Sequence, residues 1–241
     1  MSPEAPSIDA VIFDWGGVLT PWHTIDLREQ WHAYGAVYDP SRADELAVLL
    51  LEAEDACWRA GRQHQRSATL DEVFLGVGID PTGPRHRAAL AAYHAFWEPH
   101  TLADPDAIAT LTALRARGIK VGVLSNTLWS REFHEAVFER DGLLSLIDGA
   151  VYSSEIPFTK PHPEAFACAM ASVGVTDPTR AVFVGDRPFE DIHGSKSVGM
   201  RGVLVPHSDI PTNQRGQVEG EPDAVIHRLL DLLPLVDVWS G

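Results

Sequence analysis

The sequence predicts an α/β fold built on a doubly wound parallel sheet, with a helical subdomain inserted after the first strand. Short apolar runs rich in β-branched residues alternate with amphipathic helical segments, which is typical of buried parallel strands and their crossover helices. Several of these runs end in Asp, Ser or Gly, residue types that suit the ligand-binding edge of such a sheet. Residues 21–100 interrupt the alternation with helical patterns alone. Together these observations predict a Rossmann-like sheet with an inserted helical cap.

The alternation places the strands and helices of the sheet in chain order. Segments 105–117 and 163–173 have helical periodicity and end at or near Gly118 and Gly174, as C-terminal caps often require. A strand–helix–strand order needs crossover connections, so the strands should pair in parallel. The runs expected to form strands are residues 8–13, 119–124, 149–152, 181–185 and 202–205.

The inserted segment should form a subdomain above the carboxyl ends of the strands, because it follows the first strand's loop directly. A subdomain in that position can act as a lid. We therefore assign residues 1–20 and 101–241 to the core and residues 21–100 to the cap. Helices are expected within the cap over 41–60, 70–76 and 85–96, a surface loop over 208–222, and a last helix over 222–233.

Composition limits the possible partners. The chain has 241 residues, enough for one large core with a small accessory domain, and its hydrophobic content of 45% is ordinary for a globular protein. A formal net charge of −15 argues against nucleic acid and anionic membranes as partners. The separated Cys57 and Cys168 indicate reduced thiols, and no signal peptide or membrane-length apolar run is visible. We expect a cytoplasmic protein that binds a small molecule. The sequence is compatible with a homodimer and with a monomer.

The most informative motif is the carboxylate at the end of the first predicted strand. Asp14 follows the apolar run directly, and Gly16 and Gly17 allow the backbone to turn tightly near it. Ligands of open α/β sheets bind just beyond the carboxyl ends of the strands. The position therefore suits a nucleophile or a metal ligand.

Three later segments place further polar groups at strand ends. Ser125 and Asn126 end the second predicted strand and can bind an anionic oxygen. Lys160 lies before a proline-started helix and can project as a fixed positive charge. Asp186 ends a strand and Asp191 begins the helix after it, a pairing that can hold a hard cation through oxygen ligands.

In this order, the four segments resemble the motifs of the haloacid dehalogenase superfamily, and the resemblance covers nearly the whole chain. It implies that Asp14 attacks phosphorus and becomes an aspartyl-phosphate, which water then hydrolyses. It also implies that Lys160 neutralises charge on the nucleophile and the phosphate. Phosphoryl transfer depends mostly on positioning and charge neutralisation, which such a site supplies. The residues expected to contact the phosphoryl group are Ser125, Asn126 and Gly17.

The same resemblance implies a Mg²⁺ ion as cofactor. The expected ligands are Asp14, the backbone carbonyl of Gly16 and Asp186, with Asp191 as a ligand or as support for one. The cation and Lys160 together would let a carboxylate approach an anionic phosphate in an acidic protein.

Position 16 departs from the family pattern. Phosphatases of the superfamily usually carry Asp-x-Asp in the first motif, and the second Asp protonates the leaving alcohol and later activates water. This chain has Gly16, a loss that should lower the rate roughly 10²–10⁴-fold if nothing replaces it. We interpret the chain as a phosphatase of small phosphate monoesters, sugar phosphates among them, in which a cap residue, a substrate group or solvent handles the proton.

Two alternatives stay open. The chain can be a catalytically weak relative that binds a phosphorylated ligand or a partner protein. It can also be a 2-haloacid dehalogenase, a class that lacks the second Asp and needs no metal but differs from this chain over 185–191. Phosphonoacetaldehyde hydrolases have a similar first motif, but they need a cap lysine, and residues 21–100 contain none.

The cap should choose the substrate. Trp22 and His23 follow the nucleophile loop, and the segment 58–64 resembles the cap turn that points into the pocket in this superfamily. We expect Trp31 to pack in the interior of the cap. Trp58 can have the same packing role or can contact the substrate. His23 is the candidate replacement proton donor. The residues expected to determine specificity are His23, Trp58, Arg59 and Arg62.

Overall fold

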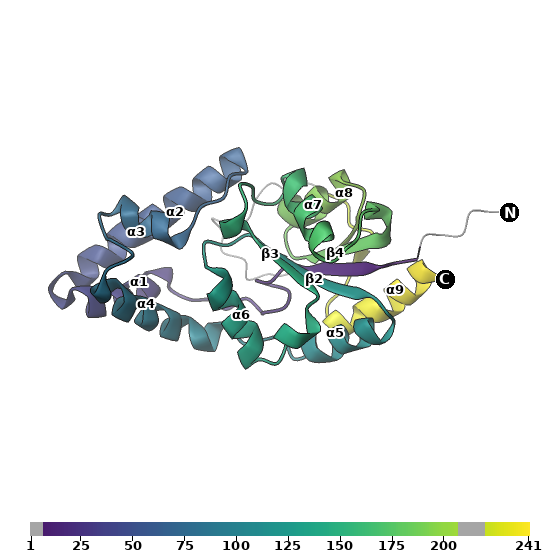
Figure 1. Ribbon diagram of the computed structural model, residues 1–241, viewed down its shortest axis with the longest axis horizontal. Helices are drawn as coiled ribbons and strands as arrows, with labels where there is room; N and C mark the ends of the chain where they lie inside the picture. The colour runs from purple at the N-terminus through teal and green to yellow at the C-terminus, as the bar shows by residue number, and fades with distance from the viewer. Residues whose placement is uncertain (1–6, 207–219) are drawn as a thin grey trace.

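The computed structural model describes residues 7–206 and 220–241, and a six-stranded parallel sheet lies at the centre of this described part (Figure 1). The strands lie in the order β3-β2-β1-β4-β5-β6. The predicted α/β fold with a parallel sheet is confirmed. The strands are β1 Ala10–Phe13, β2 Lys120–Ser125, β3 Gly149–Tyr152, β4 Ala181–Gly185, β5 Arg201–Leu204 and β6 Ala224–Val225.

Helices cover both faces of the sheet, so the strands are apolar on both sides. Val11 and Phe13 of β1 pack into one hydrophobic cluster, while Ala10 and Ile12 pack into a second one on the opposite face. This two-sided burial explains why the strands are continuous apolar runs rather than alternating ones. The first face is covered by α5 Ala107–Ala116, α6 Arg131–Arg140 and α9 Leu232–Ser240, and the second by α7 Pro163–Ser172 and α8 Gly194–Ser197 (Figure 1).

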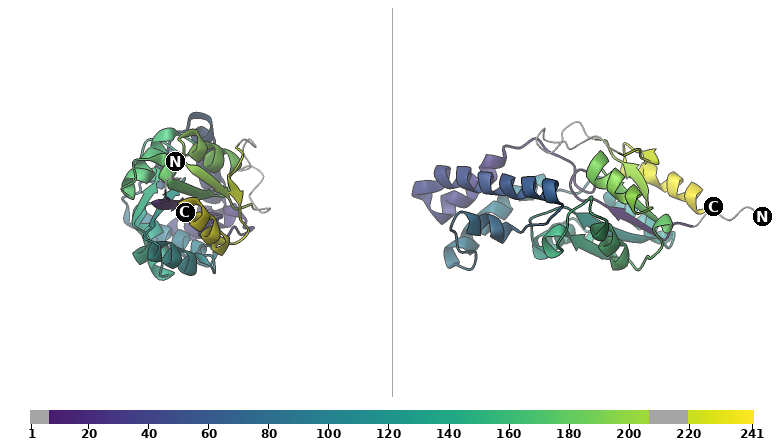
Figure 2. Two further views of the ribbon diagram at one scale, coloured as in Figure 1. Left: turned by 90° about the vertical axis from the view of Figure 1, so that its right-hand side faces the viewer. Right: turned by 90° about the horizontal axis from the view of Figure 1, so that it is seen from above.

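The inserted segment forms a helical lobe at one end of the molecule (Figures 1 and 2). Its interior is a cluster of aromatic side chains centred on the fully buried Trp31, Tyr34, Phe74 and Tyr93. Trp31 therefore packs in the interior of the lobe. The lobe contains α1 Leu27–Tyr38, α2 Ala43–His64, α3 Leu70–Gly76 and α4 Pro84–Trp97.

Two of the helices, α1 and α6, are absent from the sequence expectations. Each begins after a side-chain cap: Asp26 accepts the backbone N–H of Arg28, and Ser130 accepts that of Phe133. These caps satisfy donors that helix starts otherwise leave unpaired. Capping residues were therefore the available signal for both helices.

The last predicted helix is wrong in its position. Within 222–233 the chain first forms β6, which pairs in parallel with β5, and the final helix α9 runs from Leu232 to Ser240. Asp223 explains the difference, because its carboxylate accepts the backbone N–H of Gly202 and the ammonium of Lys196, which holds the segment against the sheet edge. Most of the loop expected over 208–222 lies outside the described residues.

No helix in the described ranges is long and apolar enough to cross a membrane.

Candidate functional site

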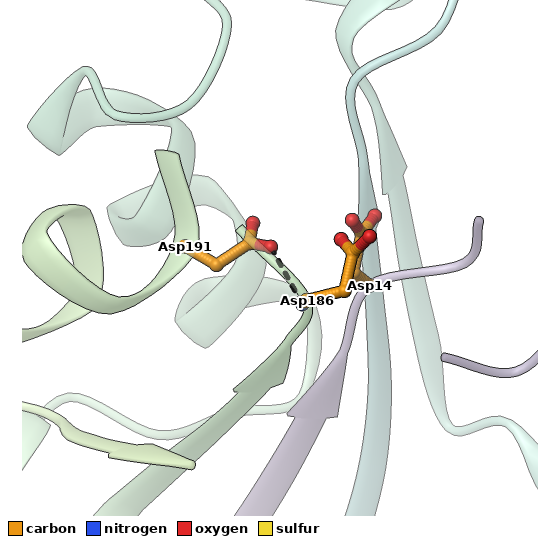
Figure 3. A group of neighbouring side chains, drawn as sticks. All are labelled: Asp14, Asp186 and Asp191. Carbon is orange, nitrogen blue, oxygen red and sulfur yellow. Dashed lines mark hydrogen bonds between the residues drawn. The ribbon is translucent and has the colours of Figure 1, made fainter. Parts of the chain in front are cut away.

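Two aspartates lie where the winding of the sheet reverses. The chain proceeds from β1 to β3 on one side and from β4 to β6 on the other, so the switch point lies between the neighbouring strands β1 and β4. Asp14 directly follows β1 and Asp186 directly follows β4. Their carboxylates lie side by side above the strand ends (Figure 3) and are almost fully buried, with exposures of 6% and 2%. Such a crevice is the usual ligand site of an open α/β sheet.

Lys160 supplies the positive charge of the site. Its Nζ lies 2.9 Å from Oδ1 of Asp14 and 2.7 Å from Oδ1 of Asp191, and the residue is 3% exposed. Burial by itself lowers the pKa of Lys160, but the two carboxylates outweigh it and raise that pKa. The ammonium therefore stays charged between the two carboxylates.

Asn126 fixes the backbone from which Lys160 projects. The Oδ1 atom of Asn126 accepts the backbone N–H of Lys160 at 2.8 Å, and its Nδ2 donates to the Lys160 carbonyl at 3.1 Å. Both ends of the amide thus contact Lys160, so the described contacts give Asn126 a positioning role. Ser125 is buried at the end of β2 and lines the cavity described below.

Asp14 is held in a low-polarity setting. Burial raises its pKa to about 6, against the lowering effect of Lys160. Its Oδ1 also accepts the backbone N–H of Trp15 at 2.8 Å. The carboxylate is therefore oriented and predominantly ionised at neutral pH, as a nucleophile requires.

Asp191 ties the loop after β4 to Lys160. Its Oδ2 accepts the backbone N–H groups of Asp186, at 3.0 Å (Figure 3), and of Arg187, at 2.9 Å. Gly185 makes room for this arrangement, because a Cβ there would lie 2.3 Å from the Cβ of Asp191. With one oxygen on the backbone and the other 2.7 Å from Nζ of Lys160, Asp191 is held in place by the protein itself.

Asp186 has the properties of a cation ligand. Among the described residues, its buried Oδ1 has no hydrogen-bond partner, although Nε of Arg187 lies 3.9 Å away. Burial raises the pKa of Asp186 to about 8 despite this neighbouring charge. Asp14, Asp186 and Asp191 each offer an oxygen within 4.8 Å of the others. All-oxygen carboxylate donors suit a hard cation such as Mg²⁺, so the residues present fit the implied ion.

Trp22 is the principal neighbour of Asp186; the sequence suggested it as a cap residue near the substrate but gave no sign of this contact. Its Nε1 donates to Oδ2 of Asp186 at 2.7 Å, and the guanidinium of Arg187 lies over its ring, 5.6 Å from the centroid. Gly17 is required beneath it: the backbone φ there is +84°, and a Cβ would lie 2.3 Å from Trp22 Nε1 and 2.5 Å from Asp186 Oδ2. At Gly16 a Cβ would meet the indole only at 3.7 Å.

A cavity of about 850 Å³ lies between this edge of the sheet and the helical lobe. His23, Trp58 and Arg62 line it, together with Asp14, Gly16, Gly17, Ser125, Asn126 and Lys160. Arg59 is exposed and does not line it. Successive helical residues point about 100° apart, so Arg59 leaves the face on which Trp58 and Arg62 lie. The specificity role expected for Arg59 therefore has no support in the structure. Asp186 and Asp191 are buried and are not among the residues that line the cavity.

Comparisons with known proteins agree with this architecture. A model of the haloacid dehalogenase-like hydrolase family matches residues 8–199. The chain is 30% identical over 235 residues to a glyceraldehyde 3-phosphate phosphatase of Methanopyrus kandleri, covering 95% of this chain and 97% of that protein.

Solved structures share the fold but differ in reaction. The structure of a phosphatase of this type from Thermococcus onnurineus matches with a TM-score of 0.66 at 23% identity, over 95% of this chain and 98% of that one. The L-2-haloacid dehalogenase of Xanthobacter autotrophicus matches with a TM-score of 0.63 at 21% identity, over 95% and 98%. Structural likeness at this identity shows the fold alone, so the site must separate the two reactions.

Proposed function

This chain belongs to the haloacid dehalogenase-like hydrolase family, and from that premise we propose that it is a magnesium-dependent phosphatase of small phosphate monoesters. The observation that carries the proposal is the pair Asp14 and Asp186. Two carboxylates are buried side by side, and one oxygen of Asp186 has no hydrogen-bond partner in the described part of the chain. A phosphatase needs the first as nucleophile and the second as cation ligand, and the fit of these carboxylates to a cation favours that reaction over metal-free dehalogenation.

In the proposed reaction, an oxygen of Asp14 attacks phosphorus as the bond from phosphorus to the leaving oxygen breaks. The product is an aspartyl-phosphate on Asp14 and an alcohol that must gain a proton. Attack of water on phosphorus then frees inorganic phosphate and restores the carboxylate. Bound Mg²⁺, held by Asp14, Asp186 and the Gly16 carbonyl, would supply charge neutralisation for the phosphate.

Lys160 performs the second neutralisation. Its ammonium contacts Asp14, so it also lies close enough to stabilise the negative charge of phosphoryl oxygens that bind beside the nucleophile. Ser125 and the turn at Gly17 line the same end of the cavity, which supports them as phosphate contacts. Asn126 contributes by fixing Lys160.

His23 is the proposed proton donor in place of an acid at position 16. It lines the cavity close in sequence to the nucleophile loop, and its ring lies 5.9 Å from that of His100. Its imidazole can donate a proton to a leaving alcohol that enters the cavity. The named activity of the Methanopyrus relative supports a small phosphorylated metabolite as substrate.

The test is phosphate release from sugar phosphates, alkyl phosphates and para-nitrophenyl phosphate, with Mg²⁺ and with a chelator. The proposal predicts Mg²⁺-dependent turnover that Asp14→Asn removes. It also predicts that His23→Ala slows alkyl esters more than para-nitrophenyl phosphate, whose leaving group needs no proton. Release of halide from 2-haloacids without metal would instead support a dehalogenase. No turnover on any compound would support a binding role.

A further inference from the structure

One face of α2 forms a graded wall of the cavity. Its lining residues recur at the spacing of a single helical face, and the C-terminal end of that face adjoins the reaction site, because the Gln65 carbonyl accepts the backbone N–H of Thr159, next to Lys160. Arg62 therefore lies at the phosphate end. Glu54 and Asp55 lie about eight residues earlier, roughly 12 Å farther along the helix axis. The wall thus changes from cationic to anionic with distance from Asp14.

Glu54 is held as an oriented acceptor at the far end. Its Oε2 accepts Nε2 of Gln30 at 2.9 Å and Nε1 of Trp31 at 2.8 Å. In the described part of the chain, its Oε1 accepts one long hydrogen bond, 3.5 Å from Nε1 of Trp58. Burial raises the pKa of Glu54 to about 7, and no Lys, Arg or His among the described residues forms an ion pair with it. The carboxylate is thus positioned but lacks a counter-charge.

Aromatic rings line the cavity from the Glu54 end, where Trp58 contacts Glu54, to Trp129, whose ring lies 5.3 Å from that of Trp15. Tyr93, Trp97 and Trp129 line the cavity with Trp58. The indole N–H of Trp97 already donates to Gln30, and that of Trp129 to the Tyr93 hydroxyl, each at 2.8 Å. Because these indole N–H groups are already hydrogen-bonded, the wall presents a ligand with the faces of the rings and with carboxylate oxygens. A ligand group that fits such a wall donates hydrogen bonds and carries positive charge.

We propose that the Glu54 end of the cavity binds a cationic nitrogen on the leaving group, so that the substrate is the phosphate ester of an amine-bearing alcohol. An ammonium would pair with Glu54 and Asp55 and lie against the faces of the aromatic rings. A second anionic group there would face two carboxylates and be rejected. This inference rests on the proposed phosphatase function and narrows its substrate class.

The test uses three matched series of alkyl phosphates of increasing chain length, ending in an amine, a methyl group or a carboxylate. We expect kcat/KM to favour the amines over the methyl esters by roughly tenfold at the best length and the carboxylates to be poorest. Glu54→Gln should bring the amine-to-methyl ratio close to one. Glu52→Gln, an exposed change on the same helix outside the cavity, should leave the ratio unchanged.

A second variant, Asp55→Asn, and a binding measurement cover the case in which Glu54→Gln does not fold. If Glu54→Gln fails to fold, Asp55→Asn should lower the same ratio, because Asp55 lies outside the Gln30–Trp31 network. Calorimetric binding to the Asp14→Asn variant reports the amine preference without turnover. Equal or better kcat/KM and binding for the methyl series would overturn the inference while leaving the phosphatase function standing. An amine preference in binding without phosphate release from any ester would support the subsite and contradict the phosphatase.

Discussion

The indole of Trp22 donates a 2.7 Å hydrogen bond from Nε1 to Oδ2 of Asp186, joining the segment that leads into the helical lobe to the loop after β4. Among the described residues, the other oxygen of Asp186 has no hydrogen-bond partner; it is buried beside Asp14, 3.9 Å from Nε of Arg187. Trp22 therefore orients Asp186 from behind, as groups that hold metal-binding carboxylates commonly do.

Trp22→Phe should weaken Mg²⁺ binding by roughly tenfold, because the carboxylate of Asp186 loses the bond that fixes its rotamer. Isothermal titration of the protein with Mg²⁺ measures this directly. Trp58→Phe is the matched control, since Trp58 lines the cavity and bonds to Glu54 instead. Unchanged affinity in Trp22→Phe would show that Trp22 does not position Asp186.

Gly16→Asp should raise turnover of alkyl phosphates relative to para-nitrophenyl phosphate, by up to roughly 10²-fold, because it returns an acid beside the leaving group. A Cβ at this position meets the Trp22 ring at an ordinary 3.7 Å, so the side chain can enter without displacing backbone. Steady-state kinetics on both ester types provides the measurement. Gly16→Asn has the same size without the acid; an equal gain in that variant would rule out proton donation.

Lys160→Met should lower the free energy of unfolding of the metal-free protein by about 3–5 kcal/mol, because it leaves Asp14 and Asp191 buried without their counter-charge. Chemical denaturation measures the change. Lys120→Met is the comparison: its ion pair with Asp148 involves a half-exposed ammonium, so the loss should stay below about 1 kcal/mol. Similar losses in both variants would mean that the buried lysine is not neutralising the site.

Glu54 should make the protein less stable as pH rises from about 4.5 to about 7. The pKa of the carboxyl is raised from 4.5 to about 7 by burial, so in this window the unfolded chain has lost a proton that the folded one keeps. The contribution is on the order of 3 kcal/mol. Denaturation of wild type and Glu54→Gln at pH 5 and pH 8 tests it. The variant should lose less stability between the two; equal slopes would contradict a buried, unpaired Glu54.

The residues at the strand ends could be predicted because the pattern that identifies them is local. A short apolar run predicts a buried strand, so the polar residue that follows it must lie at the edge of the sheet. Asp14, Ser125 and Asp186 were found in this way, and the structure places all three at strand ends. Lys160 followed from its place before a proline-started helix and from the resemblance of the motifs.

The contacts that join distant segments could not be predicted. The Trp22–Asp186 bond spans 164 positions of the chain and depends on the turn at Gly17, which no periodicity reports. Nothing in the sequence distinguishes Glu54 from the other acidic residues of its amphipathic helix. The side chains that donate hydrogen bonds to it are brought together only by the packing of the lobe. The last helix was predicted in the wrong place for a similar reason. The hydrogen bond from the backbone N–H of Gly202 to Asp223 holds the following residues beside β5, where they form β6.

The central claim is that Asp14 becomes phosphorylated, and trapping of the intermediate tests it most directly. Acid quench of the Mg²⁺-loaded enzyme during turnover, followed by borohydride reduction, converts an acyl phosphate into an alcohol that peptide mass spectrometry locates. The account predicts homoserine at position 14 in wild type and none in Asp14→Asn. Turnover without modification of Asp14, or modification at another residue, would contradict the account.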